Sequence, residues 1–261
     1  MTDGTFRESV TEADFVDAMS QLGYPEIQDL NNLYTNNGVQ RRWARFVGLD
    51  GKRQDAAHRY LHPRLRDGAH PNLHVIVEAQ VMRVLFDEGD AGGKRAAGIE
   101  YRPNPQFQAL SVGLTQTPVK TVRARRLVVV SCGACGTPSV LERSGVGDPE
   151  ILQRAGVGPV VSNLPGVGSN YQDHHLVIPA YRSSVGPGDT LDSWLFGRES
   201  TTQLIEKRDR RIGWNAIDAA SKLRPSEDEV DALGPEFRAA WDRDFKDAPN
   251  RPLMLFALIN R

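Results

Sequence analysis

The stretch that decides the fold runs from Leu127 to Gly147 and reads LVVVSCGACGTPSVLERSGVG. Its first four residues are apolar without alternation, which is typical of a strand buried on both faces of a parallel sheet. Small residues follow, and Thr137 and Pro138 have the residue types of a helix N-cap and a first helical position. We therefore predict a buried parallel strand over Leu127–Val130 and a helix that begins at Thr137 or Pro138.

Further strands are predicted on the amino-terminal side of this stretch. Leu73, Val75 and Val77 alternate with His74 and Ile76, which is typical of a half-buried strand. Three more segments that are strand candidates follow before Leu127, and they are Val81–Phe86, Ala96–Arg102 and Val119–Val122. Together with the strand-to-helix unit, they predict an α/β body around residues 40 to 175.

Helices are predicted where capping residues meet apolar residues at helical spacing. Thr11 is the expected N-cap of a helix that Gly23 ends, and residues 55–65 form a second, short helix. Asp148-Pro149 and Pro235 each begin a helix in the carboxyl-terminal half, Ser226 forms a capping box with Glu229, and Leu253–Ile259 is an apolar strand. The second part of the chain is therefore expected to be α+β.

Bulk composition excludes several classes of protein. The 261 residues contain 32 Lys and Arg and 33 Asp and Glu. This balanced charge gives no sign of the basic surface that binds nucleic acids or anionic membranes. No apolar run approaches the roughly 20 residues that span a bilayer, and Met1–Val10 has no secretory signal. The two cysteines cannot form a disulfide framework, which favours a reducing compartment. We expect no nucleic-acid or membrane partner.

Residues 127–176 resemble the glucose–methanol–choline (GMC) oxidoreductases. The residues that carry the resemblance are Gly133-Ala134, Thr137-Pro138, Leu141 and Ser144-Gly145-Val146-Gly147, followed by Pro165-Gly166-Val167-Gly168 and Gln172-Asp173-His174. Glu142 departs from the pattern, because an apolar residue is usual there. The resemblance extends upstream through Arg53, Ala56-Ala57, Tyr60-Leu61 and Asn72-Leu73. The runs Ser144–Pro149 and Trp214–Ile217 look closest to the fungal alcohol (methanol) oxidase branch.

The resemblance implies FAD as cofactor and places its binding residues. In the family, a valine in the strand after the Asn-Leu-x-Val segment offers backbone hydrogen bonds to adenine, and by spacing that residue is Val81. Ser131, Cys132 and Gly133 follow a predicted strand end, where small residues let the backbone approach a nucleotide closely. The alternative interpretation is that Val81 is an ordinary strand residue and Gly133 an ordinary turn.

Two family elements are missing from the sequence. No G-x-G-x-x-G opens a helix after a strand, so the predicted Rossmann-like domain lacks its diphosphate cradle. The family's catalytic histidine pair or His–Asn pair lies near the carboxyl end of the full-length enzymes, and His174 and His175 belong to another motif. We therefore expect no catalytic and no metal-binding residue in this chain. We also expect the chain to be an internal fragment, in which residues 41–175 come from an incomplete FAD-binding domain and residues 1–40 and 176–261 come from the substrate-binding domain.

The resemblance implies that the parent protein oxidises a primary, short-chain alcohol and that oxygen is its electron acceptor. It could be a homo-oligomer, and its compartment is open between cytoplasm and peroxisome. A truncated product or pseudoenzyme without catalysis is the alternative. Two remote alternatives are a thiol–disulfide oxidoreductase, from the C-x-x-C spacing of Cys132 and Cys135, and a metal phosphoesterase, from Asp173-His174-His175. No aromatic residue precedes Cys132, and no carboxylate cluster accompanies the histidines.

Overall fold

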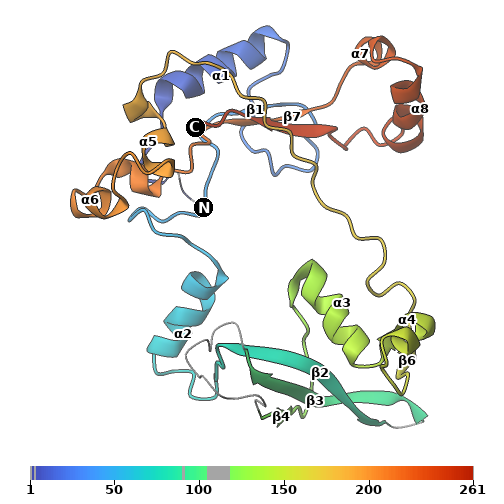
Figure 1. Ribbon diagram of the computed structural model, residues 1–261. Helices are drawn as coiled ribbons and strands as arrows, with labels where there is room; N and C mark the ends of the chain where they lie inside the picture. The colour runs from blue at the N-terminus through green and yellow to red at the C-terminus, as the bar shows by residue number, and fades with distance from the viewer. Residues whose placement is uncertain (1, 3, 90–91, 105–117, 261) are drawn as a thin grey trace. The chain divides into compact units, whose positions relative to one another are not determined.

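The structure, a computed structural model, describes residues 2, 4–89, 92–104 and 118–260 (Figure 1). The chain divides into two compact units. The first unit comprises residues 1–73 and 181–261, and the second comprises residues 74–180. Residues 41–73 thus share a unit with the amino-terminal segment. Among the described residues, no helix has the length and apolar character needed to cross a membrane.

The first unit is built on a small antiparallel sheet and a helix. The strands β1 (Gly38–Gln40), β7 (Ala220–Leu223) and β8 (Met254–Ala257) pair in the order β1-β7-β8. The helix α1 (Ser9–Gln21) packs Phe15, Val16 and Met19 against Val39 and Ala219 in one buried cluster. These three side chains share a helix face because residues three or four apart lie on one side.

The predicted helix after Thr11 is confirmed, but its start is different. Glu8 is the N-cap, and its side chain accepts hydrogen bonds from the backbone N–H groups of Val10 and Thr11. Thr11 lies inside the first turn and is buried. Gly23 ends the helix with φ +89°, a conformation that glycine adopts without steric cost.

Short helices complete the first unit. A second apolar cluster contains Phe6, Leu191, Trp214 and Ala216. The remaining elements are the π-helix η1 (Ala57–Leu61), α2 (His62–Arg66), the 3₁₀ turns η3 (Pro187–Asp189) and η4 (Arg210–Gly213), α5 (Asp192–Leu195), α6 (Thr201–Glu206), α7 (Glu227–Ala232) and α8 (Pro235–Asp244).

The predicted features of α7 and α8 are confirmed. Ser226 and Glu229 form the capping box in both directions. Pro235 occupies the first turn of α8, where its missing N–H costs nothing. Trp241 is buried and stacks on Phe245 with ring centroids 5.6 Å apart. The predicted carboxyl-terminal strand is β8.

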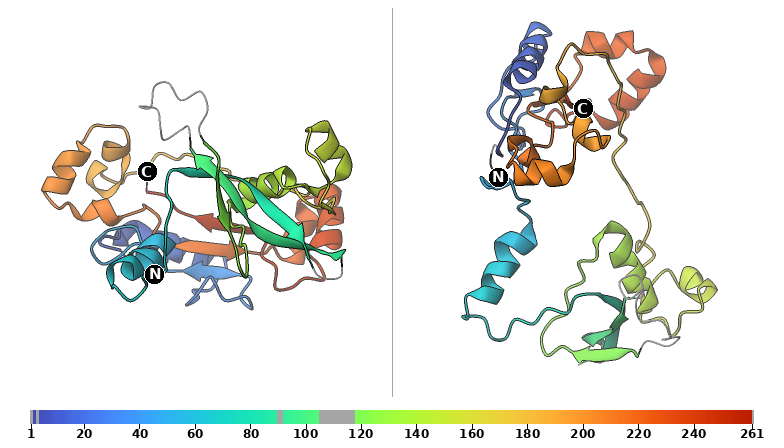
Figure 2. Two further views of the ribbon diagram at one scale, coloured as in Figure 1. Left: turned by 90° about the horizontal axis from the view of Figure 1, so that it is seen from below. Right: turned by 60° about the vertical axis from the view of Figure 1, so that its left-hand side comes forward.

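The second unit contains a three-stranded antiparallel sheet. The strands β2 (Ala79–Glu88), β3 (Lys94–Pro103) and β4 (Lys120–Arg123) pair in the order β2-β3-β4, so the three predicted strands over these segments are confirmed. Figure 2 shows this sheet, coloured turquoise to green, from two further sides. The helix α3 (Gly133–Arg143) packs on β2. The helix α4 (Pro149–Arg154) follows, with Asp148 as the predicted N-cap, and β5 (Val146–Gly147) pairs with β6 (Ser162–Asn163).

The predicted parallel strand over Leu127–Val130 is wrong. These residues form no strand, and the side chains of Leu127 and Val129 are 74% and 72% exposed. A strand needs backbone partners, and the described part of the chain places none beside this segment. The alternating segment Leu73–Val77 is also not a strand, and Val75, Ile76 and Val77 are exposed for the same reason.

The predicted start of the following helix is wrong as well. The helix α3 begins at Gly133, and its N-cap is Cys132. Thr137 lies inside the helix, where its hydroxyl accepts a hydrogen bond of 2.9 Å from the Cys132 backbone N–H. Pro138 is therefore an internal proline of α3 and not its first residue.

Candidate cofactor-binding site

The carboxyl-terminal end of α3 is fixed to the edge strand β2. The buried Ser144 hydroxyl accepts a hydrogen bond of 2.8 Å from the Val84 N–H and donates one of 2.5 Å to the Val140 carbonyl. The Arg143 guanidinium donates to the carbonyls of Met82, at 2.8 Å, and Val81, at 3.3 Å. A register shift between Val81 and Arg83 leaves Met82 without a partner in β3. Side chains of the Arg143-Ser144 pair thus satisfy backbone groups that an edge strand exposes.

The two glycines after Ser144 connect α3 to the next strand pair. Gly145 has φ +81°, and a Cβ at this position would lie 2.6 Å from the Pro159 carbonyl oxygen. Its own carbonyl accepts hydrogen bonds from the N–H groups of Val161, at 2.7 Å, and Ser162, at 3.2 Å. Gly147 pairs with β6. The Ser-Gly-Val-Gly motif is therefore a scaffold that joins β2, α3 and β6.

The amino-terminal end of α3 is open. Ser131, Cys132 and Gly133 are exposed. Gly133 has φ +81°, and a Cβ there would meet no atom within 4 Å, so the backbone conformation and not crowding favours glycine. The first N–H groups of a helix lack intrahelical acceptors and favour negative charge. Small side chains at this helix start leave the backbone accessible to an anionic ligand.

The loop that carries the Gln-Asp-His motif lies close to this helix start. The Tyr171 hydroxyl donates a hydrogen bond of 3.1 Å to Asp173 Oδ2, and this bond, with a contribution from the nearby Cys135 thiol, raises the pKa of Tyr171. The backbone N–H of His174 donates to Asp173 Oδ1 at 2.7 Å and lowers the pKa of that carboxyl. His174 and His175 are exposed. Among the described residues, no three possible metal ligands come together.

The residues predicted to bind the cofactor lie at opposite ends of one helix. Val81 contacts Arg143, the last residue of α3, whereas Ser131, Cys132 and Gly133 form its start. The 11 residues of α3 span about 16 Å at 1.5 Å per residue. The structure therefore does not bring Val81 into contact with the other three. A ligand that touched both ends would have to be extended.

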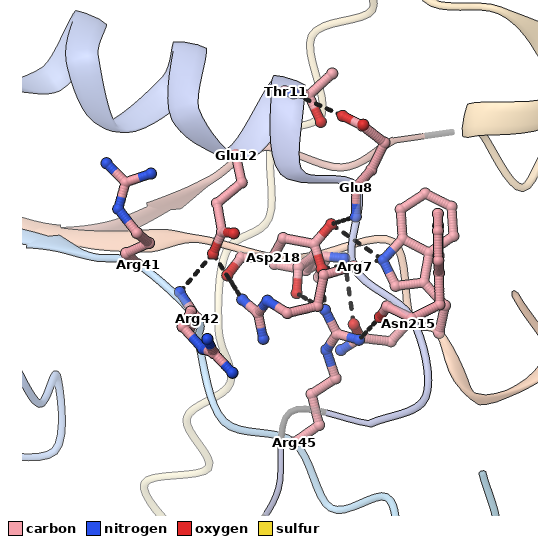
Figure 3. Close-up of polar contacts among 12 residues, drawn as sticks. Arg7, Glu8, Thr11, Glu12, Arg41, Arg42, Arg45, Asn215 and Asp218 are labelled. Atoms are coloured by element: carbon pink, nitrogen blue, oxygen red, sulfur yellow. Dashed lines mark hydrogen bonds and ion pairs between the residues drawn. The ribbon is translucent and has the colours of Figure 1, made fainter. Parts of the chain in front are cut away.

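The sequence did not reveal a buried ion pair in the first unit (Figure 3). Arg45 and Asp218 form this pair, and their side chains are each 2% exposed. Trp214 Nε1 donates to both carboxylate oxygens of Asp218, at 3.0 and 3.1 Å, and the backbone N–H of Glu8 donates to Asp218 Oδ2 at 3.0 Å. Arg45 also donates to the Phe6 carbonyl at 2.7 Å.

The polar network continues around Glu12 of α1. Glu12 Oε1 accepts hydrogen bonds from Arg7 Nη2, at 2.8 Å, and from the backbone N–H of Arg42, at 2.5 Å. The network thus ties the amino-terminal segment, residues 42–45 and the Trp214–Asp218 turn together. The resemblance at Trp214–Ile217 pointed toward this turn, but nothing in the sequence paired Asp218 with Arg45, 173 positions away.

Comparison with known proteins shows the family. The family model described as GMC oxidoreductase matches residues 2–176, more than half of the chain. This chain therefore belongs to the GMC oxidoreductase family. It is 33% identical over 256 residues to an alcohol oxidase of Pichia angusta, an alignment that covers 95% of this chain and 36% of that protein. It is 40% identical over 159 residues to an oxygen-dependent choline dehydrogenase of Pseudomonas putida, covering 61% of this chain and 24% of the relative.

Solved structures share the fold. An FAD-dependent oxidoreductase from Chaetomium thermophilum superimposes with a TM-score of 0.68 and 20% identity, covering 97% of this chain and 45% of that chain. A formate oxidase of Aspergillus oryzae gives a TM-score of 0.70 at 17% identity, covering 98% and 41%. The predicted mixed α/β fold is confirmed. The chain spans 36% of the length of the alcohol oxidase that it matches.

Proposed function

We propose that this chain is an internal part of an FAD-dependent oxidoreductase that acts on the CH–OH group of primary, short-chain alcohols, with oxygen as the electron acceptor. Membership of the GMC oxidoreductase family supports the reaction class, and the alcohol oxidase relatives support the substrate class. The observation that carries the proposal is the segment 131–147, which contains α3 and the Ser-Gly-Val-Gly motif. Its carboxyl-terminal end is fixed to β2, while its amino-terminal end is exposed.

The open start of α3 fits one part of FAD. Gly133 allows the backbone to come close, and Ser131 and Cys132 add only small side chains beside it. Val81, at the other end of α3, would offer its backbone to adenine. Bound FAD would supply a hydride acceptor for the alcohol carbon.

This chain would bind and position the cofactor but would not move the proton. Neither His174 nor His175 is assigned to catalysis. We place the base that takes the hydroxyl proton outside these 261 residues. Residues 41–175 would contribute to FAD binding, and residues 1–40 and 176–261 to the site for the alcohol.

The experiment compares the 261-residue chain with a longer protein that restores the flanking segments of its reading frame. Each protein is purified, incubated with FAD and desalted, and the absorbance of bound flavin is recorded. We expect the 261-residue chain to remain colourless, because it lacks a glycine-rich diphosphate cradle. The longer protein should retain FAD and release hydrogen peroxide when methanol or ethanol is added.

The outcomes separate the parts of the proposal. A 261-residue chain that retains stoichiometric FAD and oxidises alcohol would contradict its assignment as a fragment. A longer protein that remains colourless would contradict the cofactor assignment. A longer protein that retains FAD but oxidises no alcohol would be a non-catalytic flavoprotein, and the oxidase assignment would fail.

A further inference from the structure

The only two cysteines of the sequence lie within the first turn of one helix. Cys132 is the N-cap of α3, and Cys135 lies in its first turn. Both are free thiols, and both are exposed. Neither the Ser-Gly-Val-Gly scaffold nor the contacts of α3 with β2 involves them. The proposed flavin chemistry also needs no thiol, so the pair calls for a separate explanation.

The backbone around Cys132 directs its side chain onto the helix. Its N–H is held by the Thr137 hydroxyl at 2.9 Å. A Cβ built on Gly136 would lie 2.9 Å from the Cys132 Cβ, so the Cys132 side chain begins against the surface that Gly136 leaves bare. Cys135 is the neighbour of Gly136 in the same turn. Both sulfur atoms are therefore carried by one helical turn, the arrangement from which a C-x-x-C pair can close a disulfide.

The second thiol also has a polar neighbour. The Tyr171 hydroxyl lies near the Cys135 thiol while it donates to Asp173. Tyr171 is 61% exposed, so this side of the pair is open to small molecules in solution. An accessible thiol with a second thiol within reach is the usual setting for reversible oxidation.

We propose that Cys132 and Cys135 form an oxidant-sensitive dithiol that a hydroperoxide converts to an intramolecular disulfide. One thiol sulfur attacks the peroxide oxygen, the O–O bond breaks, and a sulfenic acid and one molecule of water or alcohol form. The other thiol attacks the sulfenic sulfur, the S–O bond breaks, and the S–S bond forms with release of water. Two thiols lose two electrons in total, the peroxide gains them, and both thiol protons leave in the products.

Formation of this disulfide would regulate FAD binding at the start of α3. Cys132 is itself one of the residues assigned to FAD, together with its neighbours Ser131 and Gly133, so a disulfide would alter the surface that meets the cofactor. An oxidase that uses oxygen would release hydrogen peroxide, which is the required oxidant. This regulatory step rests on the proposed function, whereas formation of the disulfide does not.

The test uses the full 261-residue chain. The reduced protein is treated with hydrogen peroxide in slight excess, remaining thiols are alkylated, and the intact mass is measured over time. We expect a loss of about 2 Da, no alkylation, a monomer on non-reducing gels, and recovery of both thiols with dithiothreitol. Cys132→Ser and Cys135→Ser should each keep one thiol and trap a sulfenic acid that dimedone labels.

A geometric variant separates this pair from two independent thiols. Gly136→Ala places a methyl group against the Cys132 Cβ, while alanine favours the helix. We expect disulfide formation to slow by roughly tenfold, because a small displacement strongly lowers the rate of an intramolecular attack. Gly156→Ala, at the end of α4, is the control and should form the disulfide at the original rate.

Several results would overturn the proposal. They are products that gain oxygen without the 2 Da loss, disulfide-linked dimers as the main product, or an unchanged rate in Gly136→Ala. Because the mass measurement contains no flavin, its result does not depend on whether the protein binds FAD. A failure here would therefore leave the proposed function untouched, and a colourless longer protein would leave the disulfide untouched.

Discussion

The two units of the molecule differ in how far they bury their apolar and charged side chains. The first unit encloses two apolar clusters and the Arg45–Asp218 ion pair. The second unit leaves three apolar segments in solvent, namely Val75–Val77, the residues around Val129, and Leu176–Ile178, whereas the first unit exposes one in β8, Met254–Phe256. The helix α3 packs on β2 of its sheet. The Ser-Gly-Val-Gly scaffold and the start of α3 thus lie in the unit that contains neither buried cluster.

This difference has an energetic consequence. Burial of one large apolar side chain contributes about 1.5–3 kcal/mol to stability, so exposed valines and leucines represent stabilisation that the second unit does not obtain by itself. Polar groups at its edge are satisfied instead by Arg143 and Ser144. Stability in the first unit should depend on a buried charge pair, and stability in the second on a few backbone contacts.

The largest effect is expected for Asp218→Ala. The change removes the partner of a buried Arg45 and the acceptor for the Trp214 indole and the Glu8 N–H. An unpaired buried charge costs about 3–5 kcal/mol. Urea denaturation of the first unit measures the loss. Arg243→Ala removes an exposed ion pair with Asp244 and should leave the midpoint unchanged. Equal midpoints for the two variants would contradict the contrast between the units.

In the second unit, Gly145→Ala should have the largest effect. The left-handed φ of +81° and the contact with the Pro159 carbonyl together should cost about 3 kcal/mol. Gly156 has a similar φ of +69° but open space around it, so Gly156→Ala should cost only about 1–2 kcal/mol. Thermal denaturation compares the two. If both variants melt together, the close approach at Gly145 does not determine the stability of this unit.

The hydrogen bond between α3 and β2 is tested by Ser144→Ala. The Val84 N–H would be left buried without an acceptor, at a cost of about 1–3 kcal/mol. Ser139→Ala removes a hydroxyl that bonds only to its own helix and should change stability by less than about 0.5 kcal/mol. Hydrogen exchange at Val84 gives a local measurement. Unchanged protection in Ser144→Ala would exclude this contact as the link between helix and strand.

The smallest effect is a pH dependence in the first unit. Burial alone would raise the pKa of Glu8, but hydrogen bonds from Thr11 and Val10 hold it below its ordinary value of 4.5. A carboxyl with a lowered folded pKa stabilises the protein above its unfolded pKa and loses that contribution as the pH falls. Unfolding free energy should therefore decrease on acidification below about pH 4.5, and less steeply in Glu8→Gln. Parallel pH profiles for the two proteins would contradict this role.

Local signals in the sequence predicted much of the fold. The strands β2, β3 and β4 could be predicted because each depends on the apolar, aromatic and β-branched residues of a short segment, which act over short distances. The capping box at Ser226 and the helix start at Asp148 depend on residues three positions apart or fewer. The segment Leu127–Val130 was predicted wrongly, because its apolar run indicates burial and cannot specify which strands lie beside it.

In the candidate site, too, local features could be predicted from the sequence and long-range contacts could not. The exposed start of α3 follows from the small residues Ser131 to Gly133, although the strand before it and the first residue of the helix were predicted wrongly. The contact of Arg143 with β2 depends on a register shift at Met82, and that shift is a property of strand pairing and not of the residues. The Arg45–Asp218 pair joins distant positions, which no local pattern can reveal.

The central claim is that the start of α3 meets FAD, and the most direct test is the dissociation constant of FAD in the longer protein. Gly133→Ala and Gly156→Ala impose comparable backbone strain, at φ +81° and +69°, and both sites have open space around them. Only Gly133 lies where we place the cofactor. We predict that Gly133→Ala weakens FAD binding at least tenfold, about 1.4 kcal/mol, and that Gly156→Ala leaves it unchanged. Equal dissociation constants for the two variants would contradict the claim.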